Sequence, residues 1–101
     1  LKTYQKVLML DADNLAANIF IGNYLYLKAE REKQRIENEY KKIAAPTRMQ
    51  YARYRDGLSR VMSNGYGKAR EYLLKVVSRF PSTEARKTLD KIQLIEKEVN
   101  R

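Results

Sequence analysis

The sequence predicts an all-α fold of antiparallel helical hairpins, stacked as a short right-handed solenoid with a C-terminal capping helix. Two prolines and four glycines in 101 residues argue against a loop-rich all-β fold. Apolar residues recur at spacings of three and four. Landmarks also return at one interval, since Gly22 and Gly57 are 35 apart, Ala12 and Pro46 are 34 apart, and Pro46 and Pro81 are 35 apart. A fixed interval of this size indicates a repeat array.

Composition narrows the class of protein further. The chain has the length of one small domain and is 44% hydrophobic and 33% charged. It has no cysteine and no histidine, which removes thiolate metal sites, disulfides and the commonest general base. No apolar run approaches the length of a membrane span. The net charge of 21 − 12 = +9 is compatible with a nucleic acid, an anionic membrane surface or an acidic protein partner, but we favour a solvated surface as its explanation.

The first segment, residues 1–10, is expected to be a helix with Tyr4, Val7 and Leu8 on one face. Asp13 or Asn14 can cap the helix that follows. We expect 1–10 to be the second helix of an incomplete upstream repeat. The chain begins with leucine rather than methionine, so we expect part of a longer protein, in which an N-terminal targeting segment could precede it. The compartment stays open, with the cytoplasm slightly favoured.

Residues 15–28 form the most apolar predicted helix, which should be buried between neighbours. Gly22 lies in its middle, where glycine costs about 1 kcal/mol relative to alanine, so we expect a closely packed neighbouring helix there. Ala29 and Glu30 are not turn-forming residues. This favours one long helix from about 15 to 44 over a regular hairpin, which remains the alternative.

The following stretch is predicted to be a second hairpin. Helices are expected at 48–63 and 66–79, separated by a tight break at Asn64 and Gly65, where glycine suits a left-handed residue. Thr47 should cap the first of these helices. Pro81 should end the second, because proline cannot continue a helix. Ser82 should cap a last helix with one apolar face.

Within this stretch the chain resembles the tetratricopeptide repeat (TPR) family. The family outline has a glycine in the first helix, a small then a large apolar residue in the second, and a closing proline. Those roles fall to Gly57, Ala69, Leu73 and Pro81, with Tyr66 as the aromatic start of the second helix. The resemblance implies four parts in a single domain: the upstream helix 1–10, a divergent repeat with a long helix at 13–46, the best-matching repeat at 47–81, and a capping helix at 82–101.

No pattern in the sequence indicates catalysis. A Gly-rich phosphate loop and a metal-ligand constellation are both missing, and the serines lack a histidine partner. We therefore expect no enzyme activity, no cofactor and no metal site. The resemblance instead implies a protein–protein interaction scaffold that binds a peptide or protein partner, with an acidic partner among the options.

The groove that the resemblance implies is lined by the first helices of successive repeats. Carried over from Gly22 and Gly57, the candidate partner-binding residues are Asn23, Tyr26, Tyr51, Tyr54 and Arg55, with Ile19 and Leu58 beside them. Tyrosine offers an apolar face with a polar tip, and arginine can pair with a carboxylate. The lysines of the family's carboxylate clamp are replaced by Ile19 and Tyr51, so the full clamp is absent. Packing between helices is the alternative role for all of these residues.

Two other functions remain open. A nucleic-acid-binding helical repeat could use the run Arg48–Arg55, where bases would stack on tyrosine and phosphates would meet arginine. A structural self-association module could form a homo-oligomer through residues 1–10 and 29–44.

Overall fold

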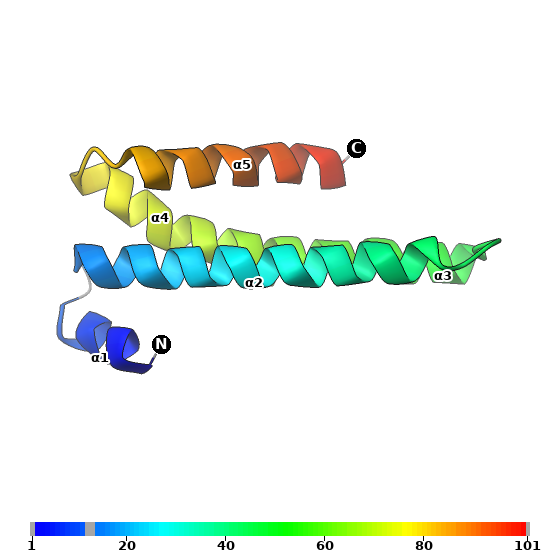
Figure 1. Ribbon diagram of the computed structural model, residues 1–101, viewed down its shortest axis with the longest axis horizontal. Coiled ribbons are helices and arrows are strands. Elements are labelled where there is room, and N and C mark those ends of the chain that lie inside the picture. The colour runs from blue at the N-terminus through cyan, green and yellow to red at the C-terminus, as the bar shows by residue number, and fades with distance from the viewer. Residues whose placement is uncertain (1, 12–13, 101) are drawn as a thin grey trace.

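The computed structural model describes residues 2–11 and 14–100, and within those ranges it contains helices and no strand. The predicted all-α class is therefore confirmed. Four rods run back and forth in Figure 1: α1, then α2, then a long rod of α3, η1 and α4, and finally α5. α1 and α5 lie on opposite sides of the pair that α2 forms with the long rod. The principal extents are 50 × 25 × 15 Å.

The first two helices follow the sequence signals. α1 spans Lys2–Leu10. α2 spans Leu15–Lys41, so the prediction of one long helix is confirmed. Asn14 caps α2, because its side-chain oxygen accepts a hydrogen bond from the backbone N–H of Ala17 at 2.9 Å. Ala12 and the alternative cap, Asp13, lie outside the described residues.

The predicted break at Asn64 and Gly65 is wrong. α3 (Arg48–Val61) continues through a π-helical turn, η1 (Met62–Tyr66), into α4 (Gly67–Arg79). No glycine in the described ranges has a positive φ, so Gly65 does not end a helix. It serves close packing instead, since a Cβ built on Gly65 would lie 2.6 Å from the Ala29 Cβ of α2. Residues 48–79 are thus one helical rod with a π turn inside it, and α2 is its antiparallel partner.

The ends of the remaining helices agree with the predictions. Thr47 caps α3 in a capping box with Gln50, in which each side chain accepts a hydrogen bond from the other residue's backbone N–H. α4 ends before Pro81, with Phe80 in an extended conformation. Ser82 caps α5 (Thr83–Val99) through the N–H of Ala85.

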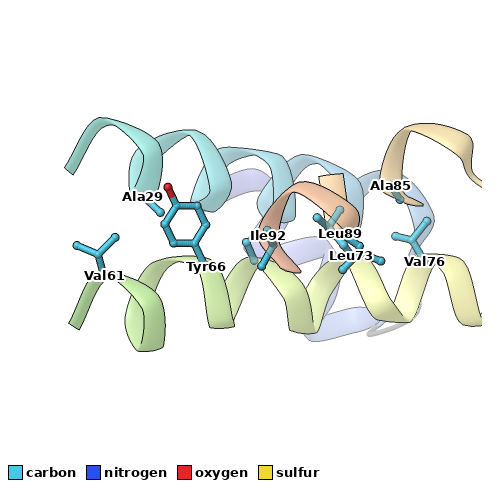
Figure 2. Close-up of a cluster of buried hydrophobic side chains, with 9 residues drawn as sticks. Ala29, Val61, Tyr66, Leu73, Val76, Ala85, Leu89 and Ile92 are labelled. Carbon is cyan, nitrogen blue, oxygen red and sulfur yellow. The ribbon is translucent and has the colours of Figure 1, made fainter. Parts of the chain in front are cut away.

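The core lies between α2, α4 and α5, and Figure 2 shows its side chains reaching inward from all three helices. Leu73 is completely buried and lies against Gly22, where a Cβ would stand 2.9 Å from two of its carbon atoms. The prediction that a neighbouring helix packs on Gly22 is therefore confirmed. The cluster consists of Ala29, Val61, Tyr66, Ala69, Leu73, Val76, Ala85, Leu89 and Ile92.

One end of the molecule lacks such a core. We call residues 36–57, where α2 and α3 meet at their turn, the arm, and the rest of the molecule the body. Figure 1 shows the arm extending past the ends of α1 and α5. Every residue of the arm is at least partly exposed, whereas the body contains every buried residue in the described part of the chain.

Candidate partner-binding site

Three tyrosines gather on the arm, where little else is packed. Tyr40 of α2 stacks on Tyr54 of α3, with ring centroids 4.2 Å apart and planes 15° from parallel. Tyr51 lies beside both rings at centroid distances of 6.3 and 6.4 Å, and it is 52% exposed. Aromatic pairs with this geometry contribute about 0.5–1.5 kcal/mol beyond the area that they bury. The arm therefore presents a preformed aromatic surface.

A groove runs between α2 and α3 beside these rings. Its volume is about 330 Å³. Its apolar lining comes from Ile36, Tyr40, Ile43, Tyr54 and Gly57, and its polar lining from Glu39, Gln50 and Arg53. This volume lies near the lower end of the range of about 300–1,000 Å³ for small-molecule pockets, and it can also hold one or two large side chains.

Gly57 helps to form this groove rather than a tight helix crossing. A Cβ at Gly57 would meet the Ile36 Cδ1 at 3.4 Å, which is ordinary van der Waals contact. The comparable distances at Gly22 and Gly65 are 2.9 and 2.6 Å. Gly57 faces Ile36 of α2, and not the second helix of the predicted hairpin, and its packing is the loosest of the three.

The end of the arm carries a run of positive charge. Between residues 40 and 55 there are five cationic side chains and no acidic one. The three carboxylates of the arm each pair with a basic side chain four residues away: Glu37 with Lys33 at 3.2 Å, Glu39 with Arg35 at 3.3 Å and Asp56 with Arg60 at 3.3 Å. These pairs leave the positive charge at the end of the arm uncompensated.

The predicted site residues fall into two separate regions. Tyr51 and Tyr54 are on the arm, and only Tyr54 lines the groove. Asn23 and Tyr26 are half-buried on α2 in the body. The two pairs therefore do not line one common groove.

Tyr26 contributes to the edge of the core. Its ring lies edge-on to the ring of Tyr66, with centroids 5.9 Å apart. Burial, followed by the nearby charge of Glu30, raises the pKa of Tyr26 above its ordinary value of 10.0. The ring of Tyr26 therefore packs between helices, which is the alternative role that the sequence left open for this residue.

Arg55 has a structural contact of its own. Its guanidinium donates a hydrogen bond to the backbone carbonyl oxygen of Val99, at the end of α5. This carbonyl is one of those that a helix leaves without an internal partner at its C-terminus. Arg55 therefore joins α3 to α5, and Leu58, its predicted neighbour in the groove, is buried in the body.

Two contributors to the arm surface were not among the predicted site residues. Tyr40 completes the aromatic cluster, and Arg53 borders both the groove and a shallow depression formed by Arg48, Met49, Ala52 and Asp56. The narrow stripe of Ile36, Tyr40 and Ile43 among charged residues was the available signal for Tyr40. Its pairing with Tyr54 depends on the long α2 turning back at Pro46.

Where α2 crosses η1, a buried tyrosine meets a carboxylate. Tyr66 is fully buried, and its hydroxyl donates a hydrogen bond to Glu30. Burial first, and then this hydrogen bond and the charge of Glu30, raise the pKa of Tyr66 far above its ordinary value of 10.0. Figure 2 shows the ring reaching from the rod toward α2 beside Ala29. This contact joins α2 to η1 in the body.

Other kinds of site find no support within residues 2–11 and 14–100. Those residues contain no group of three or more acidic side chains placed to hold a metal ion. None of their helices combines the length and the apolar character needed to cross a membrane.

Comparisons with known proteins identify a similar solved structure. No protein-family model matches the chain, and no curated protein matches it. A crystal structure at 2.19 Å resolution of a candidate protein-binding protein from Bacteroides ovatus is similar to it, with 65% sequence identity and a TM-score of 0.93. The match covers 97% of this chain and 48% of that protein, so the chain spans about half the length of its relative.

Proposed function

We propose that this chain is a non-catalytic protein-interaction module, and that the groove and tyrosines of the arm form its partner-binding surface. The observation that carries the proposal is the aromatic cluster of Tyr40, Tyr51 and Tyr54 in a region without a core. These side chains contribute little to the buried body, so their grouping suits a ligand better than folding. The description of the Bacteroides ovatus relative as a candidate protein-binding protein supports the same class of function.

We further propose that the body is a TPR-type unit whose two helices are not the pair that the sequence analysis expected. In this arrangement residues 15–29 of α2 and helix α4 are the two helices of one repeat, with α1 before it and α5 after it. Residues 30–66 would be an insertion that lengthens the hairpin. The close contact of Gly22 with Leu73, next to the fully buried Ala69, supports this assignment because the family places small residues where its two helices meet.

Selection from a displayed library of random peptides tests the proposed function. The folded protein is immobilised, and the recovered peptides are then tested against Tyr54→Ala and the matched variant Tyr24→Ala, because Tyr24 is a 40% exposed tyrosine of the body. We expect binding that Tyr54→Ala weakens at least about tenfold, or 1.4 kcal/mol, and that Tyr24→Ala leaves unchanged. Peptides that bind both variants equally would place the partner surface elsewhere, and failure to recover any peptide would remove the function.

Self-association is a second candidate, and exposed apolar side chains of the body favour it. Met9 and Leu10 of α1 are 86% and 91% exposed, and Leu27 of α2 is 53% exposed. Burying such residues against a second copy would be favourable. Sedimentation velocity over a range of protein concentrations distinguishes the two candidates, since only self-association increases the sedimentation coefficient with concentration.

A further inference from the structure

We infer that the partner segment held by the arm is acidic and carries one large apolar side chain, which enters the groove between α2 and α3. This inference rests on the proposed protein-binding function and specifies the chemistry of its partner. It draws on the charge of the arm, the lining of the groove and the way the tyrosine rings are used.

The charge of the arm selects an anionic partner. Its carboxylates are already paired within their own helices, whereas no ion pair or side-chain hydrogen bond is found in the described structure for Lys41, Lys42, Arg48 or Arg53. The fifth cation, Arg55, is held by the carbonyl of Val99. Four cations grouped at one end of an elongated molecule attract and orient acidic segments.

The groove adds an apolar requirement. Its apolar lining includes Ile36, Ile43 and the two stacked rings, and Arg53 also lines it. Glu39 is the acidic group in this lining, and its ion pair with Arg35 offsets its charge. An apolar side chain in the groove would therefore place neighbouring carboxylates of the same segment close to Arg53, where a charge-assisted hydrogen bond can form.

The arrangement of the rings favours an acidic protein segment over a single-stranded nucleic acid. Proteins that bind single strands offer aromatic faces on which successive bases stack. Here Tyr40 and Tyr54 stack on each other, so each has already used one face on its neighbour. The groove beside them has the volume for a side chain. Nucleic acid binding is accordingly an alternative outcome of the test.

The test measures fluorescence polarisation of labelled short peptides with the whole chain at about 0.15 M salt. The probe is a glutamate-rich peptide with one central phenylalanine, and its controls replace that phenylalanine with serine or all glutamates with lysine. An oligothymidylate of about 16 nucleotides serves as the nucleic-acid probe. The protein variants are Lys42→Glu with Arg53→Glu, and the matched reversal Lys87→Glu with Lys91→Glu on the exposed face of α5.

We expect the glutamate-rich probe with phenylalanine to bind at least about tenfold more tightly than either control peptide. Reversing Lys42 and Arg53 should weaken that binding by at least about tenfold, whereas the α5 reversal should change it less than about threefold. Circular dichroism of each variant verifies that the fold is kept.

Three results would overturn the inference. The first is equal or weaker binding of the glutamate-rich probe compared with its controls, the second is an equal response to the two charge reversals, and the third is tighter binding of the oligothymidylate. The library selection separates this failure from failure of the proposed function. If the selected peptides depend on Tyr54 but are neutral or basic, the protein-binding function stands and the acidic partner is rejected.

Discussion

The body and the arm are built from the same two rods, yet they use their side chains in opposite ways. In the body, small residues bring α2 and η1–α4 so close that added methyl groups would collide. In the arm the same rods separate around a groove, and no side chain between 36 and 57 is fully buried. The difference teaches that the buried core and the proposed binding surface occupy separate lengths of the hairpin. Substitutions in the body should therefore affect unfolding, and substitutions in the arm should affect binding.

The largest loss of stability is expected from Leu73→Ala in the body. The side chain is fully buried against Gly22, so its removal leaves a cavity that we expect to lower the free energy of unfolding by about 2–5 kcal/mol. Leu94→Ala on α5 is the matched control, because that leucine is 62% exposed and should change stability by no more than about 0.5 kcal/mol. Urea unfolding followed by circular dichroism measures both variants. Equal losses would show that the core does not lie between α2 and α4.

A smaller loss is expected from Gly65→Ala. Alanine is a better helix former than glycine, but its Cβ would lie 2.6 Å from the Cβ of Ala29, a rigid and buried neighbour. We expect a net loss of about 1–3 kcal/mol in the same unfolding measurement, because such overpacking forces the backbones apart. A more stable variant would contradict the close approach of the rod and α2 at η1.

Alkaline pH should weaken the contact between Tyr66 and Glu30. Because the pKa of Tyr66 is raised in the folded state, the folded protein retains this proton above pH 10, where the unfolded chain loses it. Its contribution to stability is complete below pH 10 and is lost as pH rises toward the folded pKa. Stability should therefore decrease with pH above 10.

Tyr66→Phe should reduce the steepness of that decrease. At neutral pH the variant should cost only about 1 kcal/mol, since it removes one hydrogen bond to Glu30. Thermal unfolding midpoints measured from pH 7 to about pH 11 give the loss at neutral pH and the steepness of the alkaline decrease. An unchanged slope in the variant would mean that other tyrosines, and not Tyr66, carry the alkaline effect.

The smallest effect is expected from Gly57→Ala in the arm, and it should have the opposite sign. The new Cβ would meet Ile36 at 3.4 Å, which a flexible side chain tolerates, so the gain in helix propensity should stabilise the protein by up to about 1 kcal/mol. The comparison with Gly65→Ala in one unfolding series tests whether the arm is loosely packed. Destabilisation by Gly57→Ala would show that the arm is as tight as the body.

Most of the secondary structure could be predicted because its signals are local. Asn14, Thr47 and Ser82 cap helices as their residue types indicate, and the residue before Pro81 leaves the helix. The great length of α2 also followed from a local fact, the lack of turn-forming residues at Ala29 and Glu30.

The main error was the predicted turn at Asn64 and Gly65, where the local residue types were misleading. Asn64 and Gly65 are typical turn residues, yet the rod remains helical there because Gly65 meets Ala29, which is distant in sequence. Recognising this contact requires knowing that α2 lies alongside. Because of this error the sequence analysis paired α4 with α3 instead of α2, and it misplaced the groove accordingly.

The site shows the same limit. Tyr51 and Tyr54 could be singled out from the sequence as an aromatic pair, but whether they meet Asn23 and Tyr26 depends on how far the arm extends from the body. The bond from Arg55 to the end of α5 joins residues 44 apart and leaves no pattern in the sequence. The sequence indicated the types of residue in the site, but it did not indicate which distant residues they contact.

The π-helical turn η1 has a consequence for how such an arm could arise and change. A π turn is commonly an α-helix with one residue inserted, and each residue of an α-helix advances about 100° around its axis. Deleting one residue from Met62–Tyr66 would thus turn all of α3 by roughly that angle relative to α4. The tyrosines and arginines of α3 would then face a new direction while α4 kept its contacts with α2 and α5. One residue in the rod therefore sets the direction in which the recognition surface points.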